Sequence, residues 1–192
     1  MRANRTWGAA VALVSCTLAL GWPRPAAATV VVHEEVEDQV RAADAVVLAT
    51  VARVGTRQVA GGTHTVVRLR VERWLKGRGG RVVTLEEPGG RSAHGLTRVA
   101  GAPRYAPGDR VVAMLQRHAD GTHRTRGLAA GRYLVLPTLG GDPPVVRDLR
   151  DLTMVTWAGG RMRAARGGVE RYALRDLLRR IEAVVAYEEA QR

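Results

Sequence analysis

The residues whose types and spacing most directly suggest chemistry are two histidines in the stretch RHADGTHR, Arg117–Arg124. An Asp-Gly pair between two strands is a strong signal for a two-residue hairpin turn. With that turn, His118 would lie opposite His123, with their Cβ atoms about 4.5–5.5 Å apart, close enough to bind one metal ion. A structural zinc ion needs four ligands and a catalytic one three. The favoured interpretation is therefore a pair of solvated residues beside a turn, with no metal and no cofactor.

Other catalytic patterns are weaker. Ser92 and His94 are close in the sequence, but no Gly-x-Ser-x-Gly motif surrounds the serine and no acid is placed to orient the imidazole. Glu86 and Glu87 are adjacent, so in a strand their carboxylates point to opposite faces and cannot act as a pair. The sequence predicts no catalytic residue. A metal-assisted or hydrolytic enzyme that uses the loop histidines is the alternative.

Arginines indicate two candidate binding surfaces. The first consists of four residues on the predicted C-terminal helix: Arg171, Arg175, Arg179 and Arg180. Like charges four residues apart destabilise a helix by a few tenths of a kcal/mol, which favours either an anionic partner or a solvated outer face. The second surface is the long Gly- and Pro-rich loop Pro88–Gly108. Its candidate contact residues are Arg91, His94, Arg104 and Tyr105.

The amino-terminal segment is typical of a secretory signal peptide. Two arginines precede an uncharged apolar run, Trp7–Trp22, and prolines and the small residues Ala26–Ala28 follow it. The apolar run is shorter than the roughly 20 residues that a spanning helix needs, so cleavage after Ala28 is favoured over a single-span anchor. We expect a signal peptide over residues 1–28 and one domain over residues 29–192, located in the periplasm or secreted.

The same segment contains a pattern that resembles a bacterial lipobox, Leu13–Cys16. The cysteine of a lipobox receives a diacylglycerol, which would anchor the mature protein on a membrane through Cys16. The chain stays apolar after this cysteine, whereas a lipoprotein normally becomes polar, so lipidation is the alternative to cleavage. Cys16 is the only cysteine, and a domain that begins at Thr29 must therefore be held together by its core, without disulfide bonds.

The formal net charge of the chain is +12, and its basic residues are arginines except for Lys76. A strongly positive protein attracts polyanions, and for an exported protein these are anionic lipids or acidic wall polymers at the envelope, or another exported protein. The arginines are scattered, and few aromatic residues are present to stack on bases, so we expect no nucleic-acid partner.

The elements that position these residues are mainly strands. Apolar and alternating patterns predict strands, and helical spacing predicts a helix at each end. The expected strands are 44–54, 65–77, 81–87, 109–118, 132–137 and 145–149, and the expected helices are 34–43 and about 170–188. Segments 55–64, 88–108, 137–144 and 157–171 are expected to be loops or connections. Five or six antiparallel strands between two helices favour a small, OB-like β-barrel.

Several segments together resemble an uncharacterised family of exported bacterial proteins. They read VRAADAVVLATV, VVRLRVERWLKG, VAGAPRYAPGDRVVAML, TRGLAAGRYLV and VVRDLRDL, and that family supplies no established activity. The strand order and PGDRVVAML also resemble, more distantly, the netrin module, the OB-type barrel of tissue inhibitors of metalloproteinases. Those inhibitors use an N-terminal disulfide-bonded cysteine, whereas this chain has Thr29 there, so the resemblance implies the fold and not the activity.

These observations together favour a non-enzymatic binding or interaction module at the cell envelope. The alternatives are the enzyme with loop histidines described above and an extracellular protease inhibitor. The inhibitor would insert the loop Pro88–Gly108 into a protease.

Overall fold

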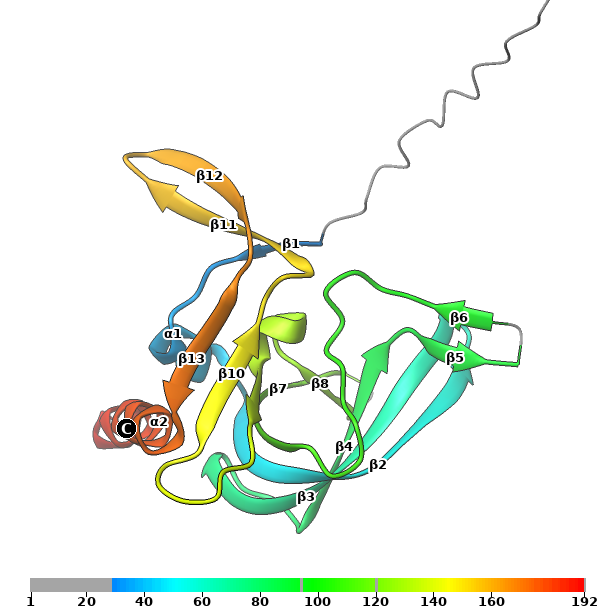
Figure 1. Cartoon of the computed structure of the whole chain (residues 1–192), viewed down its shortest axis with the longest axis horizontal. Coiled ribbons are helices and arrows are strands. Elements are labelled where there is room, and N and C mark those ends of the chain that lie inside the picture. The colour runs from blue at the N-terminus through cyan, green and yellow to red at the C-terminus, as the bar shows by residue number, and fades with distance from the viewer. Residues whose placement is uncertain (1–28, 94, 120, 192) are drawn as a thin grey trace, which may run out of the picture.

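The computed structural model describes residues 29–93, 95–119 and 121–191, and these form a mainly β fold with two α-helices (Figure 1). The first elements are β1 (Thr29–Val32), α1 (Val36–Ala42), β2 (Ala45–Val59), β3 (Gly62–Lys76), β4 (Val82–Pro88), β5 (Gly90–Ser92) and β6 (Gly95–Thr97). The next are β7 (Arg110–Arg117), β8 (His123–Thr125), the 3-10 helix η1 (Leu128–Gly131), β9 (Arg132–Val135) and β10 (Pro144–Asp148). The last are β11 (Leu152–Ala158), β12 (Arg161–Arg166), β13 (Val169–Ala173) and α2 (Leu174–Ala190).

The strands form one large sheet and two small ones. The large sheet has the order β13-β10-β9-β7-β2-β3-β4-β8, and β8 also pairs with β7. A three-stranded sheet has the order β1-β11-β12, and β5 and β6 form a two-stranded ribbon. Two pairs, β1 with β11 and β4 with β8, are parallel. The expectation of purely antiparallel strands was therefore wrong, because β1 comes from the start of the described chain and runs alongside a strand far along the sequence.

Strand β2 separates two hydrophobic cores. Val47, Ala49 and Val51 belong to a cluster within the curved part of the large sheet, whereas Val46 and Leu48 belong to a cluster that includes both helices. Strand β7 behaves in the same way, since every residue of Val111–Leu115 is fully buried. Successive side chains of a strand point to opposite faces, so a strand covered on both faces needs a continuous apolar sequence. The prediction that β7 is buried on both faces is confirmed.

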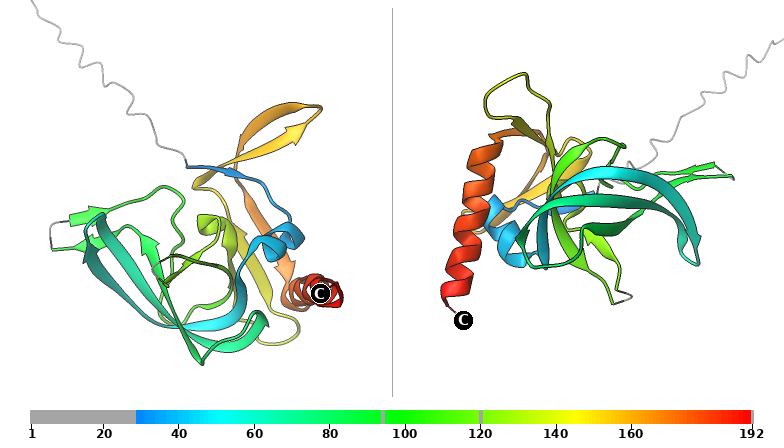
Figure 2. Two further views of the ribbon diagram at one scale, coloured as in Figure 1. Left: turned by 180° about the vertical axis from the view of Figure 1, so that it is seen from behind. Right: turned by 90° about the horizontal axis from the view of Figure 1, so that it is seen from below.

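The two helices lie side by side against one face of the large sheet (Figure 2). Helix α2 buries an apolar stripe at helical spacing against the sheet and α1, as its pattern predicts. The stripe consists of Leu174, Leu177, Ile181 and Val184. The helix begins later than residue 170, because Val169–Ala173 pair with β10 as β13.

Segment 157–171, expected to be a flexible connection, instead contains strands. Gly159 and Gly160 have φ angles of +59° and +73°, which suit the two-residue turn that joins β11 to β12. All residues of Arg161–Arg166 are exposed, so burial imposes no alternation on β12 and the sequence carries no strand pattern. In Figure 1 this hairpin projects from the body of the protein beside β1.

Two other expected loops also contain strands. Segment 55–64 forms the ends of β2 and β3, whose residues pair as far as Val59 and Gly62. Cross-strand β-branched residues, such as Thr56 opposite Thr65, favour this extension. The loop 88–108 contains the ribbon of β5 and β6, because its glycines permit a tight reversal of the chain.

Candidate functional site

The hairpin between β7 and β8 places its histidines differently from the prediction. Arg117 pairs with His123, and the backbone N–H of His118 donates to the carbonyl of Thr122 at 2.8 Å. Gly121 has a φ angle of +80°, typical of a three-residue loop that ends in a glycine bulge. The predicted two-residue turn, with His118 opposite His123, was wrong because the glycine closes this longer loop.

Both histidines line a cavity of about 900 Å³ beside the turn between β3 and β4. Burial, and then the positive charge of Arg117, lower the pKa of His123, which favours its neutral form. Within residues 29–93, 95–119 and 121–191, no three His, Cys, Asp or Glu residues are grouped so that they could hold a metal ion. The β7–β8 hairpin therefore offers two imidazoles, those of His118 and His123, without a third metal-binding side chain grouped with them among the described residues.

The four arginines predicted to form a helical stripe are divided in the structure. Arg171 lies on β13, and only the other three are on α2. Arg180 donates to both carboxylate oxygens of Glu37, at 2.6 and 2.7 Å, and Arg179 forms an ion pair with Asp176. Part of the predicted cationic surface is therefore neutralised within the chain, which weakens it as a site for an external anion.

The loop residues, in contrast, come together. Arg91, Arg104 and Tyr105 all line one hollow of about 630 Å³, to which Arg98 also contributes. The fourth predicted residue, His94, lies outside the described residues. We call this hollow, formed by β2, β3 and the segment 88–105, the loop hollow.

Two glycines bring the loop close to the long β2–β3 hairpin. Gly89 and Gly90 have φ angles of +87° and +148°, which favour glycine. A Cβ atom on Gly90 would lie 2.9 Å from the Thr65 hydroxyl, and one on Gly89 would lie 2.8 Å from the carbonyl oxygen of Thr97. The Thr65 hydroxyl donates to the Gly89 carbonyl at 2.8 Å. The floor of the loop hollow therefore depends on close contact between backbone and threonine side chains.

Behind the wall of the loop hollow, a chain of hydrogen bonds leads to a buried acid. Tyr105 donates to the Thr125 hydroxyl at 2.6 Å, and that hydroxyl donates to Glu87 Oε1 at 2.6 Å. The backbone N–H of Thr125 donates to the same oxygen at 2.8 Å. The Glu87 side chain is fully buried, and burial raises its pKa to about 7 despite these hydrogen bonds. Its other oxygen, Oε2, has no hydrogen-bond partner in the structure.

Sequence reasoning separated Glu86 from Glu87 but missed that Glu87 is a buried group. Its neighbour Glu86 forms an ion pair with Arg57, whereas Glu87 contacts β8, so the two carboxylates have different partners. The available signal was the alternation Val83, Leu85, Glu87, which places the acid on the apolar face of β4. Burial also raises the pKa of Tyr105.

We predict a modest loss of stability for Tyr105→Phe. The substitution removes the hydroxyl that donates to Thr125 but leaves the bonds from Thr125 to Glu87 intact, so the free energy of unfolding should fall by about 1 kcal/mol. Urea denaturation measures this change. An unchanged free energy of unfolding would contradict a stabilising role for the hydrogen bond from Tyr105 to Thr125.

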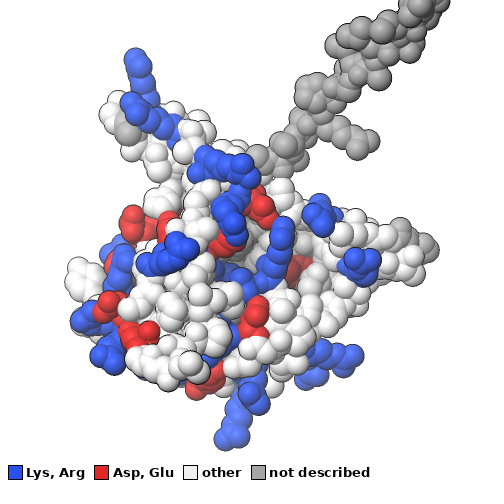
Figure 3. All heavy atoms as spheres, viewed as in Figure 1, with Lys and Arg blue, Asp and Glu red and all other residues white. Residues whose placement is uncertain are grey.

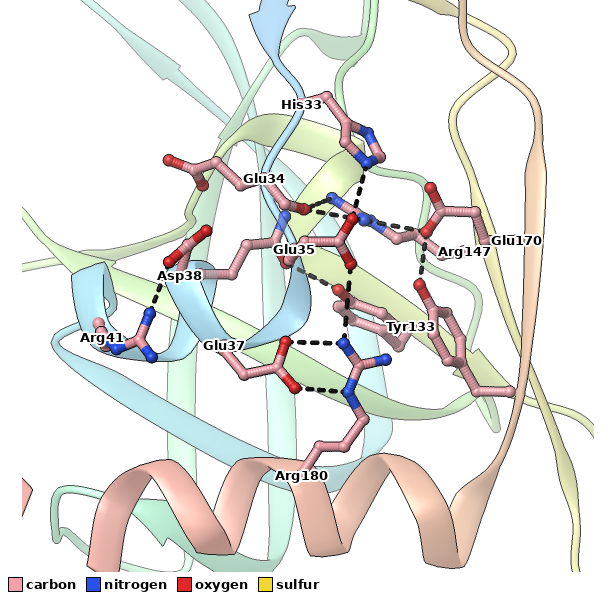
Figure 4. A network of polar contacts seen from close by, with 12 residues as sticks. His33, Glu34, Glu35, Glu37, Asp38, Arg41, Tyr133, Arg147, Glu170 and Arg180 are labelled. Carbon is pink, nitrogen blue, oxygen red and sulfur yellow. Dashed lines mark hydrogen bonds and ion pairs between the residues drawn. The ribbon is translucent and has the colours of Figure 1, made fainter. Parts of the chain in front are cut away.

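A second polar network joins α1 to β10 and β13 (Figure 4). Arg147 is 1% exposed, and its guanidinium donates to the carbonyl of Ala130 at 2.8 Å and to Glu170 at 2.9 Å. Tyr172 donates to the same Glu170 oxygen at 2.6 Å. The guanidinium also lies over the ring of Tyr133, 5.4 Å from its centroid. Because these donors and acceptors pair with one another, we assign this network to the stability of the fold.

Comparison with protein-family models and with curated proteins found no match for this chain.

Proposed function

We propose that the chain is a non-enzymatic binding module of the cell envelope, built on a small OB-like barrel and exported after removal of residues 1–28. The pairing of β8 with both β4 and β7 supports the barrel, because it links β7, β2, β3, β4 and β8 in a ring. The N-terminal pattern of arginines, apolar residues and small residues supports export.

We propose that the loop hollow binds an anionic group of an envelope polymer. The observation that carries this proposal is the presence of three arginines, Arg91, Arg98 and Arg104, around one concave surface. Arginine presents a planar set of donors that matches carboxylate and phosphate groups. Arg91 and Arg98 are exposed, and Asp151 holds Arg104 at 2.7 Å, so two of the three guanidinium groups are the candidates to bind the ligand.

The way the loop 88–108 is held against the rest of the protein supports anion binding over the protease-inhibitor alternative. An inhibitory loop must project into a protease cleft, whereas Gly89 is bound to Thr65 and Arg104 to Asp151, which hold the loop against the body. The enzyme alternative would use the histidines of the β7–β8 hairpin, which line a different cavity from the three arginines.

The double substitution Arg91→Gln/Arg98→Gln tests the binding proposal. We expect it to weaken binding of a uronic-acid oligosaccharide or a short polyphosphate roughly ten-fold, because it removes two charge-assisted interactions. Isothermal titration calorimetry at low salt measures the affinity. The two probes distinguish carboxylate from phosphate recognition.

The matched control is Arg78→Gln/Arg81→Gln, which makes the same change in net charge at the far end of β4, where both arginines are exposed. This control should bind the probes nearly as the parent protein does. An equal loss in both variants would show that only the overall charge attracts the polymer. Absence of binding to either probe by the parent protein would contradict the anionic ligand.

A further inference from the structure

The three-stranded sheet β1-β11-β12 exposes an apolar face. The large apolar side chains most exposed on it are Val30 at 62%, Val32 at 57%, Trp157 at 70% and Met162 at 64%. Scattered exposed apolar residues are ordinary, but a contiguous apolar surface marks a site of interaction. We call these four residues the arm face.

The strand register places the arm face on one side of the sheet. Val32 pairs with Val155, and Trp157, two residues further along β11, pairs with Met162. Paired residues of neighbouring strands share a face, as do residues two apart in one strand. Val155, between Val32 and Trp157 on this face, is buried, so the exposed arm face has two parts: Val30 and Val32 on β1, and Trp157 and Met162 next to the Gly159–Gly160 turn at the tip of the hairpin.

The same hairpin is purely basic. Segment 152–166 contains three arginines, Arg161, Arg163 and Arg166, and no acidic residue, and all three arginines are exposed. In Figure 3 acidic and basic side chains lie close together over the body, whereas the projecting hairpin shows only basic ones. The register places Arg166 on the same side of the sheet as the arm face, and Arg161 and Arg163 on the opposite face of the sheet. A hairpin that enters tip first therefore brings a tryptophan and arginines from both faces to the interface of an anionic bilayer, where tryptophan and arginine both lie favourably.

We propose that the β11–β12 hairpin docks the protein on anionic lipid, with Trp157 and Met162 entering the interface and the arginines contacting headgroups. The sequence that precedes the described residues supports this occupant. Residues 1–28, whose sequence predicts a membrane-directed segment, lead directly into β1, and β1 is an edge strand of this same sheet. With a lipid on Cys16, or with residues 1–28 still attached, the arm face therefore lies beside a membrane anchor, whereas after cleavage at Ala28 docking depends on the apolar residues and arginines of the hairpin itself. This proposal is independent of the ligand of the loop hollow.

Within the described ranges, no helix has the length and apolar character needed to cross a bilayer. A second copy of the chain is a weaker occupant, because pairing along the free edge of β12 would bring its arginines close to those of another β12. Charged side chains on an edge strand oppose such pairing.

The test places an environment-sensitive fluorophore on the hairpin of the full chain. Met162→Cys, in a Cys16→Ser background, provides one label, and Tyr187→Cys on α2, where Tyr187 is 63% exposed, provides the reference. Each labelled protein is mixed with vesicles of equal parts phosphatidylglycerol and phosphatidylcholine, and with vesicles of phosphatidylcholine alone. We expect a blue shift at position 162 only with phosphatidylglycerol, and no shift at position 187.

Charge variants separate the hairpin from the arginines of α2. With the label at position 162, Arg161→Gln/Arg163→Gln should weaken vesicle partitioning by about five-fold per arginine, and added salt should weaken it further. The matched variant Arg175→Gln/Arg179→Gln should change partitioning little.

Three results would overturn the proposal: a label at position 162 that stays in water, equal shifts at both labelled positions, or a loss for the α2 variant as large as that for the hairpin variant. A blue shift at position 162 that grows with protein concentration in the absence of vesicles would also overturn it. That last result would assign the arm face to a second copy of the chain.

Discussion

Replacing Arg147 by alanine is expected to lower the free energy of unfolding by about 3–5 kcal/mol, the usual cost of removing one partner from a buried ion pair. The side chain is 1% exposed, and its loss leaves the Ala130 carbonyl without its 2.8 Å donor. It also leaves the Glu170 carboxylate without its cation. Burial opposes ionisation of this acid, yet hydrogen bonding by Tyr172 and the charge of Arg147 keep its pKa below the usual value.

Urea denaturation of Arg147→Ala measures the loss, and two further variants identify its cause. Arg147→Met keeps much of the side-chain volume, so a similar loss for this variant would assign the effect to unpaired polar groups. Arg150→Ala removes an exposed arginine that forms an ion pair with Asp148 at the surface and should leave stability unchanged. Equal losses for Arg147→Ala and Arg150→Ala would contradict the structural role assigned to the buried network.

The buried strands could be predicted because burial requires a recognisable pattern of apolar residues in the sequence. Parts of β2 and β7, Ala45–Ala49 and Val111–Leu115, are covered on both faces and are continuously apolar, and α2 has a single apolar stripe. Strand β12 has no such pattern, because its residues are exposed and its extended conformation comes from backbone pairing with β11. The N-terminal end of α2 was misplaced for a related reason, since pairing with β10 extends Val169–Ala173 into a strand.

The candidate site was predicted in part. Composition alone indicated the loop 88–108, and Arg91, Arg104 and Tyr105 do line one hollow. The position of His123 opposite Arg117 depends on which turn the glycine adopts, and Asp-Gly suits more than one. Glu87 was missed because its burial depends on β8, which pairs with β4 through a single residue pair from a distant part of the sequence.

Glu87→Gln is expected to remove a pH dependence of stability. The pKa of this carboxyl is about 7 in the folded protein, against 4.5 for its unperturbed value, so folding favours the protonated form. The parent protein should therefore lose about 3 kcal/mol as the pH rises from about 4.5 to about 7, and should stay at the lower stability above that. Below pH 4.5 the carboxyl is protonated in both the folded and the unfolded state and contributes no pH dependence.

Glutamine keeps the acceptor for the two bonds from Thr125 and carries no charge at any of these pH values. Removing the buried charge recovers the roughly 3 kcal/mol that the parent protein loses above pH 7. The amide nitrogen takes the place of Oε2, which has no partner, and this unpaired group costs about 1 kcal/mol, so we expect a net gain of about 2 kcal/mol at pH 8. Near pH 4, where the parent carboxyl is protonated, the variant should instead be about 1 kcal/mol less stable than the parent protein. Urea denaturation across this range measures both curves.

The matched control is Glu86→Gln, which changes the adjacent acid. Its carboxylate pairs with Arg57 and lies 3.7 Å from His64, so removing its charge breaks an ion pair and should not stabilise the protein at pH 8. If the Glu87→Gln curve runs parallel to that of the parent protein, Glu87 is ionised in the folded state. The hydrogen-bond chain from Tyr105 would then end on a carboxylate, and a nearby positive charge would have to compensate it; Arg124 on β8, whose charge lowers the pKa of Glu87, is the candidate.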